Sequence, residues 1–281
     1  MRTSQRANMG RKEKNMDCFV DERDNKLIEQ DPYTFFMLGK IMHGQCRVLL
    51  TDHERMILCH SEHPYPVWIW TPDNVTEKEL EKTYQLTKSY FPFDEGFAFN
   101  MKYHLAKYFI KRAEEEGKKL AIRKNMFAYD CLELIPPKGD ADGMHHLCTE
   151  RDLEEIVEFY DLMTKETGID KQSRDAYRLK AKEAIEQKTI YFWENEQGRH
   201  VASCLYRLNG KLASISLVYT RVEERRKHYA ENLVYQVSKI AQEKGYVPML
   251  YTDADYVASN ACYEKIGYKL RGKLCTIAME Q

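Results

Sequence analysis

The apolar positions in the first half of the chain alternate several times between helical and strand-like spacing. The run from Val67 to Trp70 is continuous and apolar, as in a strand buried on both faces. Thr76 and Glu79 predict a capping box at the start of a helix, and Gly117 is placed to end a second helix. We expect a helix, three strands, two helices and two strands, at about 30–50, 47–51, 56–61, 67–71, 76–90, 101–116, 120–123 and 126–135.

The second half continues this alternation with a more regular pattern. Asn209-Gly210 stands between two strand-like runs and predicts a hairpin with a type I′ turn. An apolar stripe at helical spacing begins near His228, and Gly245 ends it. The expected elements are a strand, two helices, three strands, a helix and a strand at about 144–149, 150–164, 174–187, 189–194, 200–208, 211–219, 228–244 and 249–252, then a short helix to Ile266 and a final strand pair.

A segment rich in proline, glycine and aspartate, from Pro136 to Gly143, separates two halves with a similar order of elements. We expect a domain boundary there, because 281 residues are enough for two ordinary domains. The predicted division is a disordered lead-in at 1–16, an N-terminal α/β domain at 17–137 and a second domain at 144–281. Antiparallel strands, a helix and then a strand with parallel potential predict a mixed α/β (α+β) fold.

The composition of the chain limits the classes of protein to which it could belong. With 43% hydrophobic and 31% charged residues, the chain has the make-up of a soluble globular protein. No apolar run approaches the roughly 20 residues of a membrane helix. The polar and basic stretch before Met16 lacks the apolar core of a secretory signal, so we expect a cytoplasmic protein. A net charge of −1 gives no basic field for nucleic acid or an acidic membrane surface.

The cysteines and histidines do not predict a metal site. The eight cysteines are scattered and form no Cys-x-x-Cys pair, which is typical of free thiols in a reducing compartment. His145 and His146 are neighbours in a predicted strand and would point to opposite faces. They therefore cannot easily share one metal ion.

Two segments of the second half carry chemistry. The first runs from Val218 through a basic loop into the helix that begins near His228. A helix start leaves backbone N–H groups unpaired and carries partial positive charge, so this loop is an anion site suited to a pyrophosphate. Arg225, Arg226 and Lys227 add formal charge at the same place. The second segment, Asn260 to Tyr268, follows roughly 30 residues later.

In this order and spacing, the two segments resemble the GNAT superfamily of acetyltransferases, over about 144–281. The resemblance implies a central mixed sheet flanked by helices, acetyl-CoA as co-substrate and no metal. It implies that Tyr263 protonates the leaving thiolate, that Asn260 contacts the pantetheine or holds its loop, and that a backbone N–H near Leu217 stabilises the oxyanion. The implied coenzyme-binding residues are Leu217, Val218, Tyr219, Arg225, Arg226, Lys227, His228, Tyr229, Ala230, Asn260 and Tyr263.

The sequence departs from the pattern of this family at the helix start. Arg226 and His228 stand where the pattern has glycine, which lets the backbone approach the phosphates closely. Arg226 can turn outward and keep its amide, whereas His228 could bind a phosphate or partly block the cradle. No general base is evident, since Asp253 and Asp255 are better explained as loop-capping residues and Glu223 as a solvated charge.

The expected activity is direct transfer of an acetyl group from acetyl-CoA to a primary amine of a small molecule or peptide. Two alternatives stay open: a CoA-binding or protein-interaction module that performs no transfer, and an enzyme for longer acyl groups. Acetyl-CoA and an amine acceptor are the expected partners, and a homodimer is an option. The first half lacks a basic or glycine-rich cradle and is compatible with a degenerate GNAT-like domain, as in bacterial two-domain relatives.

Overall fold

The computed structural model describes residues 16–167 and 172–280, in two compact units. Unit 1 ends at Asn125 and resumes at Lys273, and unit 2 comprises Met126–Gly272. The predicted lead-in at 1–16 lies outside the described residues, apart from Met16. No helix in the described ranges is long and apolar enough to span a membrane. All eight cysteines are free thiols, as expected, and five of them are buried.

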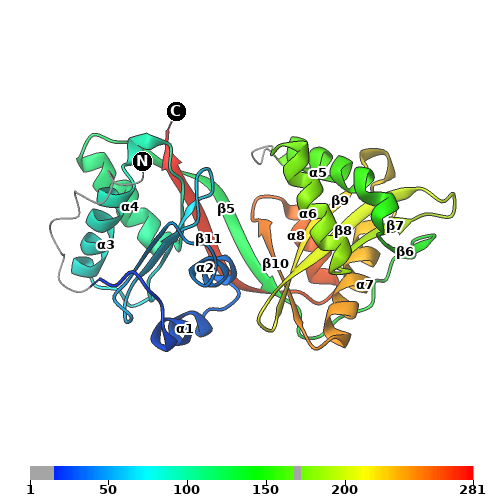
Figure 1. Ribbon diagram of the computed structural model, residues 1–281, viewed down its shortest axis with the longest axis horizontal. Helices are drawn as coiled ribbons and strands as arrows, with labels where there is room; N and C mark the ends of the chain where they lie inside the picture. The colour runs from blue at the N-terminus through cyan, green and yellow to red at the C-terminus, as the bar shows by residue number, and fades with distance from the viewer. Residues whose placement is uncertain (1–15, 168–171, 281) are drawn as a thin grey trace, which may run out of the picture. The chain divides into compact units, whose positions relative to one another are not determined.

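Unit 1 is a mixed sheet in the order β1-β2-β3-β4-β11, in which β11 is the late strand Lys269–Met279, with helices packed against it (Figure 1). Its pairs are antiparallel except β3 with β4, which are parallel and joined by a helix. Aromatic side chains such as Tyr84, Phe93 and Phe109 fill the core. The elements are α1 (Glu22–Glu29), α2 (Phe36–Met42), β1 (Val48–Thr51), β2 (Ile57–His60), β3 (Val67–Trp70), α3 (Glu77–Tyr90), η1 (Phe93–Glu95), β4 (Phe99–Met101), α4 (Tyr103–Glu115) and β5 (Leu120–Asp130).

Several expectations for unit 1 need correction. The capping box of Thr76 and Glu79 is confirmed at the start of α3. The helix predicted at 30–50 is wrong, because only α2 is helical there and a separate α1 precedes it. Pro32 explains the break, since a residue before proline avoids the helical conformation. The two strands predicted from 120 to 135 are a single strand, β5, and the short β4 was not predicted.

Unit 2 contains a mixed sheet in the order β6-β7-β8-β9-β10-β5. Neighbouring strands are antiparallel except β9 and β10, which are parallel. The fold class is therefore the predicted mixed α+β class. The elements are β6 (Met144–Leu147), η2 (Glu150–Asp152), α5 (Leu153–Thr167), α6 (Arg174–Glu186), β7 (Ile190–Glu194), β8 (His200–Asn209), β9 (Leu212–Thr220), η3 (Val222–Glu224), α7 (Tyr229–Glu243), β10 (Val247–Asp253), α8 (Val257–Lys265) and β11 (Lys269–Met279).

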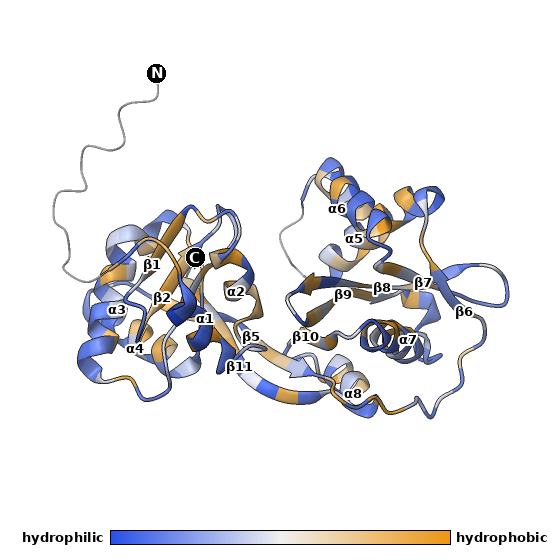
Figure 2. Ribbon diagram, turned by 60° about the horizontal axis from the view of Figure 1, so that its bottom comes forward, coloured by the Kyte–Doolittle hydropathy of each residue, from blue (hydrophilic) through white to orange (hydrophobic). Residues whose placement is uncertain are grey.

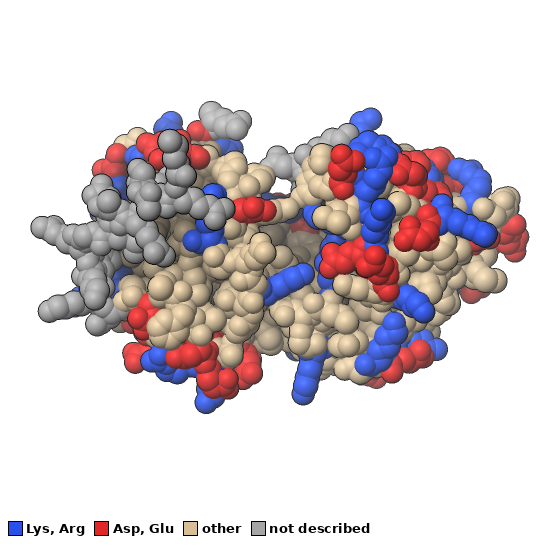
Figure 3. Space-filling view, viewed as in Figure 1, with Lys and Arg blue, Asp and Glu red and all other residues tan. Residues whose placement is uncertain are grey.

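Helices cover both faces of the unit 2 sheet, with α5 and α6 on one face and α7 on the other (Figure 2). Successive strand residues point to opposite faces, so one strand supplies both hydrophobic layers. Cys204 packs in the layer under α7, and the next residue, Leu205, packs in the layer under α5 and α6. On the outer surface of α5 and α6, acidic and basic side chains are interspersed (Figure 3).

The hairpin between β8 and β9 is confirmed, but its turn type is not. Asn209 pairs with Leu212, so Gly210 and Lys211 form the loop. Only Gly210 of these two residues has positive φ, whereas a type I′ turn needs positive φ at both central positions. The final strand pair is also corrected, because β11 is one strand.

The division into units differs from the predicted boundary between 137 and 144. It falls inside β5 and inside β11, so each of these strands contributes residues to both units. The end of β5 pairs with β10, and the end of β11 pairs with β4. The segment around Gly139 belongs to unit 2, where Asn232 donates to the carbonyl of Gly139 at 3.0 Å.

Candidate active site

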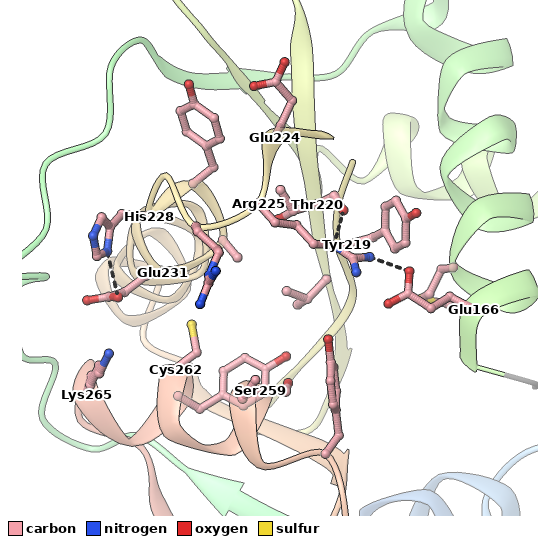
Figure 4. A pocket seen from close by; sticks show the side chains of 18 of the residues that line it. Glu166, Tyr219, Thr220, Glu224, Arg225, His228, Glu231, Ser259, Cys262 and Lys265 are labelled. Carbon is pink, nitrogen blue, oxygen red and sulfur yellow. Dashed lines mark hydrogen bonds and ion pairs between the residues drawn. The ribbon is translucent and has the colours of Figure 1, made fainter. Parts of the chain in front are cut away.

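A cavity of about 440 Å³ opens in unit 2 beside the carboxyl end of β9 (Figure 4). Its walls come from the end of α5, the loop between β9 and α7, the first turn of α7, and α8. The lining residues are Met163, Glu166, Thr167, Val218, Tyr219, Thr220, Glu224, Arg225, Arg226, His228, Tyr229, Ala230, Glu231, Tyr256, Ala258, Ser259, Cys262, Tyr263 and Lys265.

The parallel strands β9 and β10 frame the opening. Their pairing joins Leu212–Ile215 to Val247–Leu250, and β9 then continues to Thr220. A register shift between β8 and β9 accompanies a positive φ of 51° at Leu217, whose carbonyl accepts from the Ser203 hydroxyl at 2.8 Å. Leu217 itself packs in the core under α5 and does not line the cavity. The bulge therefore presents the following strand residues to the cavity.

Thr220 adds a polar group to this strand end. Its hydroxyl oxygen is buried, lacks a hydrogen-bond partner among the described residues and belongs to a lining residue. A buried hydroxyl without a partner is costly. A ligand with hydrogen-bonding groups in the cavity would satisfy it.

The start of α7 is open to an anion. His228 is the N-cap residue but makes no side-chain cap in the described chain, and the first backbone N–H groups belong to the lining residues Tyr229, Ala230 and Glu231. Arg226 and His228 both have left-handed backbones, with φ of 66° and 61°. Such a conformation costs a non-glycine residue about 1 kcal/mol or more. Glycine would adopt both angles without this cost.

The His228 ring does not fill the cradle. A Cβ added at Gly139 would lie 2.3 Å from His228 Nδ1, so the imidazole packs closely on the Gly139 backbone. The same nitrogen lies 3.4 Å from a carboxylate oxygen of Glu231. Figure 4 shows the ring on the outer side of the first turn of α7, away from the cavity centre. The helix start is thus left accessible despite the histidine.

The three predicted cations have different roles. Arg225 pairs with Glu166 across the cavity and donates to the carbonyl of Thr220 at 3.2 Å. Arg226 is exposed and lines the cavity, with no ion-pair partner in the described residues. Lys227 pairs with Glu224 at 2.7 Å and is not a lining residue. Arg226 is therefore the cation with a free guanidinium at the helix start.

Carboxylates on the cavity wall were not predicted. Glu231 is only 9% exposed and sits in the first turn of α7, and Glu166 projects from the end of α5. Glu224 is buried between Arg199 and Lys227. No spacing signal in the sequence connects Glu166 with the β9–α7 loop, which lies more than fifty residues later.

The two candidate residues of the second motif, Asn260 and Tyr263, lie in different environments in the structure. Tyr263 lines the cavity, and burial raises the pKa of its hydroxyl above the usual range. Asn260 is not a lining residue, since its amide oxygen accepts from Thr252 and its amide nitrogen donates to the carbonyls of Asp253 and Ala254. Of the two roles considered for Asn260, these contacts favour holding the loop.

The weak base candidates lie outside the cavity. Asp253 accepts from the backbone N–H of Asp255 at 3.0 Å, which is a loop-capping contact. Glu223 is 61% exposed and pairs with Arg199 at 3.5 Å. Among the described residues, none of these three acids lines the cavity.

Comparisons with known proteins concern the family of unit 2 and the fold of the whole chain. Residues 156–268 match the model of the acetyltransferase (GNAT) family. No curated protein matches the chain in sequence. A GCN5-related N-acetyltransferase from Sphaerobacter thermophilus is similar in structure, with a TM-score of 0.68 and 11% identity over 95% of this chain and 96% of that one. An acetyltransferase of the GNAT family from Colwellia psychrerythraea has a TM-score of 0.59 and 11% identity over 95% of this chain and 99% of that one.

Both structural likenesses extend over nearly the full chain, so the fold of both units is shared with these proteins. At such low identity they show the fold alone. The family match is more specific, because it spans the bulged strand, the uncapped helix and Tyr263 within unit 2. Residues 156–268 form an acetyltransferase domain of the GNAT family.

Proposed function

We propose that the chain transfers an acetyl group from acetyl-CoA to a primary amine of a small molecule or peptide. The observation that carries this proposal is the uncapped start of α7 beside the bulged end of β9, both on one cavity. Helix N-termini bind phosphate groups through backbone N–H groups and the helix dipole. A cavity with such an end and an adjacent strand edge suits a long ligand with a pyrophosphate.

The residues present fit coenzyme A. The N–H groups at Tyr229 and Ala230, with the guanidinium of Arg226, would hold the pyrophosphate. The strand end from Val218 to Thr220 would face the pantetheine. When bound, acetyl-CoA supplies the activated thioester. The orphaned Thr220 hydroxyl would gain a partner.

The proposed chemistry needs few side chains. The amine nitrogen attacks the thioester carbonyl, a strand N–H near Tyr219 stabilises the oxyanion, and the C–S bond then breaks. The hydroxyl of Tyr263, whose pKa burial raises, is protonated at neutral pH, and its place on the cavity wall would let it give its proton to the leaving thiolate. Glu166 is a lining carboxylate that could accept the proton of the amine.

Cys262 favours direct transfer over an acyl-enzyme. Its thiol comes from α8 and points into the cavity (Figure 4). Burial raises the pKa of this thiol to about 11. A neutral thiol is a poor nucleophile, so Cys262 is not prepared to carry an acetyl group.

Thermal denaturation with acetyl-CoA, free coenzyme A and no ligand tests the proposal. Binding to the native state should raise the melting temperature with ligand concentration, equivalent to about 2.7 kcal/mol at one hundred times Kd. A panel of amines with acetyl-CoA, with thiol release as the readout, then identifies the acceptor class. An unchanged melting temperature at millimolar acetyl-CoA would exclude coenzyme binding and with it the proposed reaction.

A second candidate function is a module that binds coenzyme A without transfer. The observation that favours it is the Glu231 carboxylate in the first turn of α7, because a negative charge there opposes a pyrophosphate. Binding of acetyl-CoA without thiol release across the amine panel would select the module. Thiol release that depends on a particular amine would select the enzyme.

A further inference from the structure

Two histidines and three carboxylates lie together at the sheet edge of unit 2 that β6, β7 and β8 form. They are His146, His200, Asp152, Glu155 and Glu194. None of the five lines the cavity. The rings of His146 and His200 stack with centroids 4.9 Å apart. One ligand atom from each of His146, Asp152 and His200 can be chosen so that all lie within 4.8 Å of one another. We propose that these three residues bind a divalent transition-metal ion of the zinc type.

His200 has the hydrogen bonding of a metal ligand. Its Nδ1 lies 2.7 Å from a carboxylate oxygen of Glu155, which accepts the N–H. When Nδ1 carries the proton in this way, the lone pair of Nε2 is available to a metal. Histidine ligands usually donate their second ring N–H to a carboxylate, which fixes the tautomer and the ring orientation. Glu155 is therefore the orienting residue, and His200 is the ligand.

The other two ligands are held from independent elements. His146 Nε2 lies 3.1 Å from Asp152 Oδ2, and the same oxygen accepts from the backbone N–H of Thr149 in a capping box. Glu194 Oε2 lies 3.7 Å from His200 Nε2 and 3.9 Å from His146 Nδ1. This carboxylate, or water, can supply a fourth donor. Two imidazoles and one or two carboxylates are a ligand set that zinc accepts.

The charge balance also favours a cation. Among the described residues, the ion pairs of Asp152 and Glu194 are with the two histidines only. The nearby Arg221 is committed elsewhere, since it pairs with Glu155 Oε1 at 3.1 Å and with Glu158 at 2.7 Å. A dication would neutralise the two carboxylates and leave the imidazoles neutral.

The position of the side chains suits exchange with solvent. The exposed fractions of the His146, Asp152 and His200 side chains are 32%, 12% and 15%. The donors are thus held by packing and still reachable. A second group, Asp21, Asp24 and His53, differs because both ring nitrogens of its single histidine already bond carboxylates, at 2.7 and 3.0 Å.

Cobalt titration of the full chain, without added affinity-tag histidines and after removal of metal with EDTA, tests the site. We expect one Co²⁺ per chain with the intense visible absorption of low coordination number, and displacement by Zn²⁺. His146→Ala should weaken binding at least tenfold. His145→Ala is the matched control and should bind as the wild type does, because His145 is exposed on the other side of the strand, near Tyr191. Glu155→Gln should weaken binding by about 10- to 100-fold.

The result that overturns the proposal is absence of saturable binding by the wild-type chain at millimolar Co²⁺. Equal affinity of His146→Ala and His145→Ala would overturn it as well, and the cluster would then be an ion-pair network with protonated histidines. Circular dichroism reports whether each variant folds. If His146→Ala does not fold, Glu155→Gln decides, and wild-type affinity in that variant contradicts the proposal.

Discussion

In the proposed reaction, the hydroxyl of Tyr263 gives its proton to the leaving thiolate. Its side chain is buried on the cavity wall, and its ring lies 5.9 Å from that of Tyr268. We expect Tyr263→Phe to keep the fold and the affinity for acetyl-CoA but to lower kcat by about 10²- to 10⁴-fold, the usual contribution of a general acid. Steady-state thiol release, with ligand-induced thermal shift as the folding and binding control, measures this. An unchanged kcat would mean that water protonates the thiolate.

Arg226 and Lys227 are neighbouring cations before the start of α7, and their contacts differ. The guanidinium of Arg226 faces the cavity, whereas the ammonium of Lys227 is held by Glu224. A lost charge-assisted hydrogen bond costs about 1.5–3 kcal/mol, so Arg226→Ala should raise Kd for acetyl-CoA at least tenfold. Lys227→Ala should change Kd less than twofold. Isothermal titration calorimetry gives both values, and equal effects would rule out a specific role for Arg226.

These two neighbours show how far the sequence could lead at the scale of the residue. The motif located the loop, but side-chain direction at a helix start depends on backbone angles that sequence does not give. The left-handed angles at Arg226 and His228 turn one side chain toward the cavity and the other onto Gly139. Glu166 was not predicted because it reaches the site through the fold, from a helix far away in the sequence.

At the scale of the element, side-chain capping decides which helix start can bind an anion. The start of α3 in unit 1 is closed, because Thr76 caps it and Glu79 returns a carboxylate that Arg55 holds at 2.8 Å. The start of α7 has no such side-chain cap among the described residues. The capping box of α3 could be predicted from the spacing of Thr76 and Glu79, whereas the lack of a side-chain cap on α7 could be seen only in the structure. This contrast between the two helices that join parallel strands supports coenzyme binding at the start of α7 rather than at the start of α3.

The left-handed backbone before α7 has a measurable consequence. At Arg226, glycine removes a conformational cost of about 1–2 kcal/mol and adds about 0.5–1 kcal/mol of unfolded-state entropy. We therefore expect Arg226→Gly to raise the free energy of unfolding by about 0.5–1 kcal/mol. Urea denaturation measures the change.

The control for this prediction is the next residue. Lys227 is not among the residues with positive φ, so Lys227→Gly gains no relief and should destabilise the chain. Destabilisation by Arg226→Gly equal to that by Lys227→Gly would mean that the left-handed angle at Arg226 carries no cost.

At the scale of the whole molecule, the order of elements can largely be predicted from the sequence, whereas the pairing of strands cannot. Both units contain two parallel strands joined by a helix, then a second helix and a strand. This shared order supports the interpretation of unit 1 as a degenerate GNAT-like domain, which stays a prediction because the family match ends within unit 2. The proline-rich segment predicted a boundary from local composition. The actual pairing of β5 with β10 and of β11 with β4 is long-range.

Buried or half-buried histidine–carboxylate contacts occur in both units and link stability to pH. In unit 1 the side chain of His53 is 3% exposed between Asp24 and Asp17, with Asp21 at 3.8 Å and Arg23 as the nearby cation. Burial alone would lower its pKa, but the hydrogen bonds to Asp24 and Asp17 outweigh burial, and the pKa is raised. In unit 2 the hydrogen bond to Glu155 raises the pKa of His200. Both groups therefore act with the same sign.

A raised pKa in the folded state means that folding is favoured while the histidine is protonated. The stabilisation is fully present below the unfolded value of about 6.5 and is lost as pH rises through the higher folded pKa. We therefore expect the melting temperature, measured with EDTA present, to fall as pH increases from about 6.5 upward. His53→Gln should flatten part of this slope, because it removes the imidazole that titrates between Asp24 and Asp17. A slope that is the same in His53→Gln and in the wild type would contradict the assignment to His53.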